Sequence, residues 1–239
     1  VDSTLLLALA AETLGAGRVL AAMATSTIFP QRDRPVARRI ARDLGVELVE
    51  IATAQLTDPN FTANPTDRCF YCKRLLLRRL RVLAAERGLA AVATGANASD
   101  ADDYRPGSQA ERQAQVQRPL AEAGLTKVDI RAVSRALGLE TWGRPSMACL
   151  ATRVPYGQPL SEERLGRIER AEAAVSALGF GQLRVRDHGD VARLEVPPAS
   201  LVRALELREA IVSACRQAGF AYVALDLQGF RSGAMNETL

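Results

Sequence analysis

Four cysteines are the residues of this 239-residue chain whose types and spacing point most directly to chemistry. Cys69 and Cys72 form a C-x-x-C motif at the start of a predicted helix, where two thiolates lie on one side and within reach of one metal ion or cluster. Thiolate is a soft ligand that selects zinc or iron with sulfide. A redox role for the pair would need a thioredoxin-like context, and the motif instead follows a long loop in the middle of the chain.

Cys149 and Cys215 differ in their surroundings. Cys149 lies in the irregular segment 146–153, SMACLATR, whereas Cys215 falls on the apolar side of the last predicted helix and is expected to be a buried small hydrophobe. Three thiolates without a fourth suit a four-iron cluster with one open iron, and the alternative is a nucleophilic Cys149 beside a metal-binding pair. The residues alone leave both open. The single histidine, His188, falls in a predicted hairpin turn, and we interpret it as a turn residue rather than a metal ligand.

The first residues could bind phosphate. Asp2 and Ser3 start a predicted helix that should follow the first strand of a parallel sheet, and in such folds the strand-to-helix turn binds anions through free amides and the helix dipole. The chain begins inside an apolar helical pattern with no initiator Met, so we expect further residues before Val1. With glycines there, the turn would read S-G-G-V-D-S, a pyrophosphate loop of adenylating enzymes. From V-D-S-T alone, an ordinary helix cap is the simpler interpretation.

A polar loop is predicted over residues 96–118, because the apolar periodicity stops after the predicted strand 89–94. A loop of this length is more than a connector, and it starts at the carboxyl edge where open α/β sheets bind ligands. Its acidic side chains are candidates to hold Mg²⁺ on ATP, and a solvated acidic loop is the alternative.

Arg184 and Arg186 alternate on a predicted strand in the last third of the chain. Alternate residues of a strand point to the same face, so the two guanidinium groups could clamp a phosphate together. The alternative is an exposed arginine face on a half-buried strand.

The elements that must position these residues alternate in the first half of the chain. Short apolar runs that predict strands are followed by longer amphipathic segments that predict helices. This alternation is typical of a parallel sheet wound with crossover helices, which places the first half in the α/β class. The predicted strands are 18–25, 46–52 and 89–94, and the predicted helices are 2–14, 35–44 and 69–87.

A helix is also predicted over 126–137, where Thr126 and Asp129 have the spacing of a capping box with Asp in place of Glu. It is followed by an irregular stretch, 139–158, that is rich in Gly and Pro. The domain boundary is expected near the end of this stretch.

Beyond the boundary, the pattern indicates a small α+β unit with a central hairpin. We therefore expect two domains, 1–157 and 158–239. The elements predicted for the second domain are helix 161–178, strand 182–187, strand 191–196, helix 198–218 and strand 221–227, followed by a tail from 229.

Composition narrows the class of protein. The longest apolar run, 5–11, is far shorter than the roughly 20 residues of a membrane-spanning helix. Four unevenly placed cysteines do not make a disulfide framework in a chain of this length, so we expect a reducing cytoplasm. The net charge is +4, with 31 basic and 27 acidic residues, which suits a phosphate-bearing ligand as well as a nucleic acid. Only Lys73 and Lys127 are lysines, so these two positions could be ones where a compact ammonium is needed.

Taken together, the motifs resemble those of the ATP-dependent sacrificial sulfur transferases that build the nickel-pincer nucleotide cofactor of lactate racemase, the LarE family. The resemblance runs over essentially the whole chain and is specific, because several independent blocks occur in the right order. Both lysines fall within or beside these blocks. The blocks are V-D-S-T-L-L-L, T-G-x-N-x-x-D-x-x-D-Y-R-P-G, P-L-x-E-A-G-L-T-K, R-P-S-M-A-C-L-A-T-R-x-P-Y-G, R-V-R-D-H-G-D-x-A-R-L-E-V and G-F-R-S-G-A-M-N-E.

The resemblance implies a PP-loop ATP pyrophosphatase-like domain over 1–157, of the adenine nucleotide α hydrolase type. This domain would use ATP and Mg²⁺ to adenylate a carboxylate of pyridinium-3,5-biscarboxylic acid mononucleotide, and sulfur would then replace AMP to give a thiocarboxylate. The S-G-G part of the loop is not in this sequence, and ATP binding depends on it. The nucleotide-binding residues implied are Asp2, Ser3, Thr94, Gly95, Asn97, Asp100, Asp103 and Arg105.

The resemblance implies two possible sulfur sources. In one branch of the family a cysteine at the position of Cys149 attacks the adenylate and loses its own sulfur, becoming dehydroalanine. In another branch, cysteines at the positions of Cys69, Cys72 and Cys149 hold a 4Fe-4S cluster whose open iron carries a transferable sulfide. This chain has all three cysteines, so we favour the cluster branch.

Further site residues and partners also follow from the resemblance. Arg184 and Arg186 would hold the substrate phosphate, and Glu172 and Glu195 would lie near the active site and are candidate metal ligands. The expected protein is a cytoplasmic homo-oligomer, such as a hexamer, that acts on a small-molecule mononucleotide and binds neither nucleic acid nor membrane.

Two other functions compete with this one. A tRNA-thiolating PP-loop enzyme also combines adenylation with C-x-x-C cysteines, but it would need a basic RNA-binding stripe, and the net charge here is a modest +4. A non-catalytic cluster-binding module would keep the nucleotide fold without its loop. Salt-sensitive tRNA binding would favour the first, and failure to release pyrophosphate from ATP would favour the second.

Overall fold

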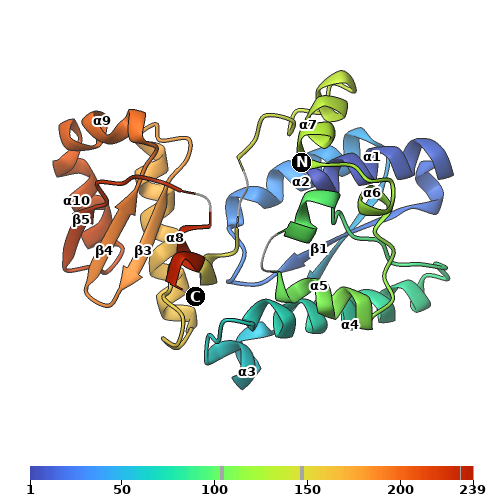
Figure 1. The fold of residues 1–239 in the computed structure, drawn as a ribbon, viewed down its shortest axis with the longest axis horizontal. Coiled ribbons are helices and arrows are strands. Elements are labelled where there is room, and N and C mark those ends of the chain that lie inside the picture. Colours follow the sequence, from blue (N-terminus) through green and yellow to red (C-terminus); the bar gives the residue numbers. More distant parts are fainter. Residues whose placement is uncertain (103–104, 146–147, 232, 239) are drawn as a thin grey trace. The chain divides into compact units, whose positions relative to one another are not determined.

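The computed structural model describes residues 1–102, 105–145, 148–231 and 233–238. Its contacts divide the chain into two compact units, which are described separately (Figure 1). The first unit comprises Val1–Ser26, Gln31–Gln55 and Asp67–Ser146, and the second comprises Thr27–Pro30, Leu56–Thr66 and Met147–Leu239.

The second unit takes in segments that lie before residue 157, where the domain boundary was expected. Asn64 is fully buried, and its Nδ2 donates to the carbonyl oxygens of Pro155 at 2.8 Å and Gln158 at 3.0 Å. The backbone amide of Leu150 donates to the carbonyl of Ile28 at 2.8 Å. These hydrogen bonds join residues far apart in the sequence, so composition alone does not show that these segments belong to the second unit.

The first unit contains a parallel pair of strands, β1 (Leu20–Thr25) and β2 (Glu47–Ala52), with Leu20 opposite Glu47 and Thr25 opposite Ala52. Helix α2 (Arg34–Asp43) connects them. The two predicted strands and the helix between them are confirmed within two residues, and the arrangement is of the α/β kind.

The predicted strand 89–94 is wrong. In the described structure, this segment forms a single parallel bridge between Ala93 and Gln117. Hydrogen bonds flank the bridge, from Thr94 N to Gln117 O and from Gln117 N to Val92 O, both at 2.9 Å. Composition does not explain the difference, because β1 has the same number of alanines, three in six residues. What differs is the pairing, which at 89–94 is limited to this bridge.

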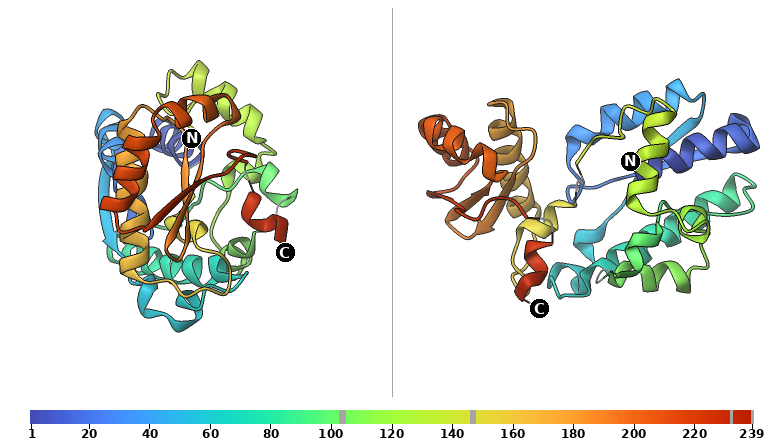
Figure 2. Two further views of the ribbon diagram at one scale, coloured as in Figure 1. Left: turned by 90° about the vertical axis from the view of Figure 1, so that its left-hand side faces the viewer. Right: turned by 45° about the horizontal axis from the view of Figure 1, so that its top comes forward.

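The predicted loop 96–118 is also wrong, because it contains a 3-10 turn, Ala98–Asp102, and helix α5 (Pro106–Gln113). Helix α5 packs beside the long helix α4 (Arg68–Glu86), and the two lie side by side in Figure 2. Buried Ala110 and Val116 pack against Leu77 of α4. Few apolar residues in α5 contribute to this contact, which is why the helical periodicity was missed.

Helices α1 (Asp2–Leu14), α6 (Pro119–Glu122) and α7 (Lys127–Ala136) complete the first unit. Leu5, Leu120 and Ile130, which are almost fully buried, form the core between them. The predicted capping box at the start of α7 is confirmed, since Thr126 Oγ1 accepts from Asp129 N at 3.3 Å and Asp129 Oδ2 accepts from Thr126 N at 2.9 Å.

The second unit contains a three-stranded sheet in the order β3-β4-β5. Strands β3 (Arg184–His188) and β4 (Val191–Glu195) form the predicted antiparallel hairpin, and β5 (Tyr222–Leu225) pairs with β4 in parallel. Helices α8 (Glu162–Ala177) and α10 (Arg208–Gln217) pack against each other and against this sheet (Figure 1).

The predicted single helix 198–218 is divided in the structure. A 3-10 turn at Pro198–Ser200 is followed by α9 (Leu201–Glu206) and then by α10, with the break at Leu207, whose ψ is 15°. A ψ of this size departs from the helical value and interrupts the regular hydrogen-bond pattern. The predicted tail contains a 3-10 turn, Ala234–Thr238, and helix α3 (Pro59–Thr62) is a further short element of this unit.

Among the described residues, no helix is both long enough and apolar enough to cross a membrane.

Candidate functional site

The start of α1 lies directly against the segment that follows Thr94. A Cβ atom added to Gly95 would be 2.9 Å from the backbone nitrogen of Ser3 and 3.1 Å from the carbonyl carbon of Asp2. Only glycine allows so close an approach without a shift of the backbone. Asp2 lies in the first turn of α1, at the positive end of the helix dipole. The structure thus brings together the predicted residues Asp2, Ser3 and Gly95.

Lys127 adds a positive charge to this site. Its Nζ donates to both carboxylate oxygens of Asp2, at 2.7 Å to Oδ1, and its backbone nitrogen donates to Ser99 Oγ at 3.0 Å. The segment around Ser99 is therefore tied to the start of α7 as well as to α1. Lys127 was not among the predicted binding residues, although its rarity as one of two lysines was a signal.

Several buried polar atoms near this segment have no hydrogen-bond partner in the described structure. They include Asn97 Oδ1 and Thr94 Oγ1, and Asn97 is only 6% exposed. Thr53 and Gln55, which follow β2, also have such atoms. A buried polar group without a partner costs free energy, so these atoms fit a site whose ligand supplies the missing partners.

Asp100 is occupied by contacts within the segment. Its Oδ1 pairs with Arg105 Nη1 at 2.8 Å, and its Oδ2 accepts from the backbone nitrogen of Asn97 at 3.1 Å. Asp103, the other acidic residue predicted here, lies outside the described residues. The role of these carboxylates in holding Mg²⁺ stays a prediction.

Cys69 and Cys72 lie in the first turns of α4, three residues apart and therefore on one face of the helix. Cys69 is exposed and Cys72 is partly exposed. Gly107 of α5 packs on the Cys69 carbonyl, where an added Cβ would be 3.5 Å from the oxygen. Lys73 pairs with the buried Glu111 at 2.8 Å, so the second lysine lies beside the cysteines.

Cys149 belongs to the second unit and directly precedes the 3-10 turn Leu150–Arg153. Its side chain is partly exposed, while its carbonyl oxygen accepts from Thr152 Oγ1 at 2.9 Å and from Arg153 Nη1 at 3.1 Å. No group of three His, Cys, Asp or Glu side chains able to hold a metal ion occurs among the described residues. The three-cysteine cluster stays a prediction.

Arg184 and Arg186 are nearly buried, with 6% and 8% of their surfaces exposed, so the alternative of an exposed arginine face is wrong. Arg186 donates from Nε and Nη2 to both oxygens of Glu195 at 2.9 Å, and its Nη1 donates to the carbonyl of Thr152 at 2.6 Å. The Arg184 guanidinium lies 5.2 Å from the centre of the Phe230 ring. Their role as phosphate ligands stays a prediction.

The two glutamates predicted near the site are both engaged by arginines. Glu172 forms a bidentate ion pair with Arg153. Glu195 forms a bidentate ion pair with Arg186 and also lies 3.2 Å from Arg193. A metal at either carboxylate would therefore have to displace a buried guanidinium. Their metal binding remains untested, but the structure gives each another role.

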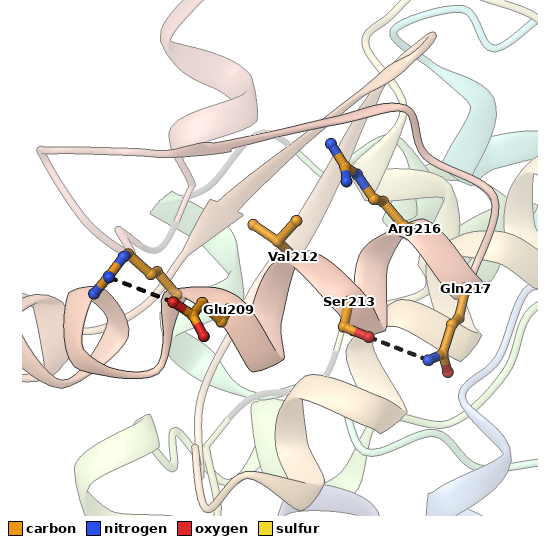
Figure 3. Close-up of a pocket in the computed structure, with 6 residues that line it drawn as sticks. Glu209, Val212, Ser213, Arg216 and Gln217 are labelled. Atoms are coloured by element: carbon orange, nitrogen blue, oxygen red, sulfur yellow. Dashed lines mark hydrogen bonds and ion pairs between the residues drawn. The ribbon is translucent and has the colours of Figure 1, made fainter.

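A shallow hollow lies on the outer face of α10 (Figure 3). Its polar side chains interact with each other, as in the hydrogen bond of 3.2 Å from Gln217 Nε2 to Ser213 Oγ. None of the residues predicted from the sequence to do chemistry lines it. The lining residues are Arg208, Glu209, Val212, Ser213, Arg216 and Gln217.

Comparisons with known proteins give the family. No protein-family model matches the chain. Over its whole length the chain is 37% identical to the pyridinium-3,5-bisthiocarboxylic acid mononucleotide synthase of Lactiplantibacillus plantarum, of which it covers 87%. The chain is also 38% identical to an uncharacterized protein of Synechocystis. This similarity covers the whole chain and 90% of the relative. An uncharacterized protein of Methanocaldococcus jannaschii is 28% identical over 71% of the chain.

The α/β first unit and the full-length similarity to a synthase define the class, a family of enzymes that contains an α/β unit. The chain belongs to the LarE family, the family predicted from its motifs.

We expect Gly95→Ala to lower the affinity for ATP about tenfold, or by about 1.4 kcal/mol, because the added Cβ would push the segment away from Ser3. Calorimetric titration of the full-length protein with ATP measures this change. Gly17→Ala is the matched control, since no heavy atom lies within 4 Å of its added Cβ. If the two variants bound ATP with equal affinity, the packing of Gly95 against Ser3 would not contribute to nucleotide binding.

We expect Arg184→Ala to weaken binding of the mononucleotide substrate by about 1.5 to 3 kcal/mol, because a charged hydrogen bond to its phosphate is lost. Steady-state kinetics would show this as a higher KM for the mononucleotide at constant KM for ATP. Arg208→Ala is the control, since the Arg208 side chain is exposed on α10. An unchanged KM in Arg184→Ala would exclude Arg184 from the substrate site.

Proposed function

We propose that this chain is an ATP-dependent sulfurtransferase that converts the carboxylates of pyridinium-3,5-biscarboxylic acid mononucleotide into thiocarboxylates. The observation that carries the proposal is the full-length similarity to a pyridinium-3,5-bisthiocarboxylic acid mononucleotide synthase. The product would serve the nickel-pincer cofactor of lactate racemase. We further propose that the protein acts in the cytoplasm as a homo-oligomer and binds neither nucleic acid nor membrane.

The first step in this proposal is adenylation. The phosphates of ATP would bind at the start of α1, where the amides after Asp2 and the helix dipole favour an anion. A carboxylate oxygen of the substrate forms a bond to the α-phosphorus, and the bond from this phosphorus to pyrophosphate breaks. Lys127 is placed to shift from Asp2 to the departing negative charge, and electrostatic stabilisation of this kind commonly supplies much of the rate enhancement.

The second step is the transfer of sulfur to the activated carbonyl, with AMP as the leaving group. Cys149 is supported as the reacting residue by its partly exposed thiol and its fixed backbone. If its own sulfur is used, the Cys149 thiol loses its proton and Sγ bonds to the carbonyl carbon as AMP leaves. Loss of the Cα proton and cleavage of the Cβ–S bond then yield the thiocarboxylate and dehydroalanine.

The alternative source, which we favour, is a 4Fe-4S cluster held by Cys69, Cys72 and Cys149. The donor set fits, because three thiolates leave one iron open and two of them lie on one face of α4. Such a cluster would supply a replaceable sulfide, so that the protein could turn over many times. Arg184 and Arg186 would hold the phosphate of the mononucleotide in either case.

We expect about four irons and a matching amount of acid-labile sulfide per chain after anaerobic purification and reconstitution. Cys69→Ala should lose most of both, since a ligand is removed. Cys215→Ala is the control, because Cys215 is buried in α10 and is not one of the proposed ligands. Absence of iron in the parent, with a mass loss at Cys149 after reaction, would instead establish single use of the Cys149 sulfur.

We expect Cys149→Ala to release pyrophosphate from ATP in the presence of substrate, as the parent does, while forming no thiocarboxylate. The reason is that adenylation uses the α1 site and sulfur transfer needs the thiol. Pyrophosphate release and product mass are measured in the same reaction. Thiocarboxylate formed by the variant would contradict the role given to Cys149, and absence of pyrophosphate release from the parent would contradict the proposed function itself.

A further inference from the structure

We infer that Arg153 and Glu172 are positioning residues for Cys149, which they hold through its backbone. The inference rests on the proposed function, which places Cys149 at the reacting centre. It gives Glu172 a role different from the metal binding expected from the sequence, and it adds Arg153, which the sequence analysis did not single out.

The pair is buried and has the geometry of strong charge-assisted hydrogen bonds. Neither side chain is more than 4% exposed, and that of Arg153 is fully buried. Arg153 Nε donates to Glu172 Oε1 at 2.8 Å, and Nη2 donates to Oε2 at 3.0 Å. Two parallel bonds of this kind fix the orientation of the guanidinium plane as well as its position.

The third nitrogen of the guanidinium faces the backbone around Cys149. Arg153 Nη1 donates to the carbonyl oxygens of Ala148 at 2.9 Å and Cys149 at 3.1 Å, and to Thr152 Oγ1 at 2.9 Å. Thr152 Oγ1 in turn donates to the Cys149 carbonyl at 2.9 Å. The carbonyl is thus held by two donors, while the thiol on the same residue stays partly exposed.

Glu172 connects this arrangement to the sheet. Besides Arg153, its Oε1 accepts from the backbone nitrogen of Val185 in β3 at 3.0 Å. A continuous set of hydrogen bonds therefore runs from β3 through Glu172 and Arg153 to the Cys149 carbonyl. The turn after Cys149 has a second tie to the same strand, since Arg186 donates to the Thr152 carbonyl at 2.6 Å.

Stability alone does not explain this pair. Buried ion pairs can often be replaced by uncharged side chains of similar volume without loss of stability, because desolvation of two charges offsets their attraction. An uncharged pair would lack the planar guanidinium group, which donates to Glu172 and to the Cys149 carbonyl at the same time. Lysine would keep the charge but not this geometry. The arrangement is therefore suited to fixing the direction of the Cys149 thiol, which both proposed sulfur sources require, either for attack on a bound adenylate or for binding of iron.

The test is the double variant Arg153→Met with Glu172→Gln, made in the full-length protein. It removes both charges together, and the amide oxygen of the introduced glutamine can still accept from Val185 N. We expect kcat for thiocarboxylate formation to fall about 100-fold, with the KM values for ATP and the mononucleotide and the release of pyrophosphate unchanged. Alkylation of Cys149 by iodoacetamide, followed by peptide mass spectrometry, should become about tenfold faster as the segment is released.

Two other cysteines serve as internal references in the same alkylation experiment. The alkylation is done on protein purified without iron, in which the exposed Cys69 should react at an unchanged rate. Cys215 is fully buried, and burial raises the pKa of its thiol to about 11, so it should stay unmodified near pH 8 while the second unit is folded. Arg167→Met is the matched control variant, because it removes a guanidinium from a different ion pair of α8 and leaves Asp187 with Arg164.

Parental kcat and a parental rate of Cys149 alkylation in the double variant would overturn the inference. If Cys215 becomes reactive, the double variant has unfolded, and Arg153→Lys then decides by the same two measurements. Slower transfer with faster Cys149 alkylation in Arg153→Lys supports positioning, and parental values overturn it. If the parent forms no thiocarboxylate, the proposed function fails, whereas the alkylation rates still report whether the pair holds Cys149.

Discussion

The second unit depends on how buried guanidinium groups are paired. An arginine taken out of water costs free energy unless its charge and its donors are met by carboxylates and carbonyls. Arg153 and Arg186 meet this requirement with Glu172 and Glu195, and each directs a remaining donor to the backbone of the turn that follows Cys149. The need to satisfy these charges therefore determines where that turn lies. The chemistry that we propose at Cys149 and the folding of the sheet beside it depend on the same hydrogen bonds.

In the first unit, the start of α1 is the place that we propose for an anion. Asp2 lies in the first turn of this helix, and Gly95 brings a second backbone against Ser3. Lys127 and Asp2 neutralise each other across the same place. Arg131 and Arg144 also lie close enough to act electrostatically on the start of α1, so this place has an excess of positive charge. Lysine suits the proposed shift from Asp2 to the departing charge better than arginine, because its ammonium is compact and rotatable.

Local patterns in the sequence predicted local structure well. Apolar periodicity located β1, β2 and α8, and the spacing of Thr126 and Asp129 predicted the capping box. The errors arose where contacts between distant residues decide the outcome. Residues 89–94 form only a bridge, and α5 is held by packing on α4. The pairing of Glu172 with Arg153 cannot be inferred from the sequence around either residue. The motifs gave the family and several residues that meet at α1. They could not show that the site glutamates are paired, because pairing is a property of the folded chain.

The hydrogen bond from Val185 to Glu172 has a consequence for the stability of the sheet. Strand β3 is at the edge of its sheet, and the outward amides of an edge strand have no neighbouring strand to accept them. Residues 184–187 are buried, so the Val185 amide cannot turn to water, and the Glu172 carboxylate accepts from it instead. Loss of that acceptor would leave a buried amide unsatisfied, so a change that loosens the Cys149 segment would also destabilise the edge of the sheet.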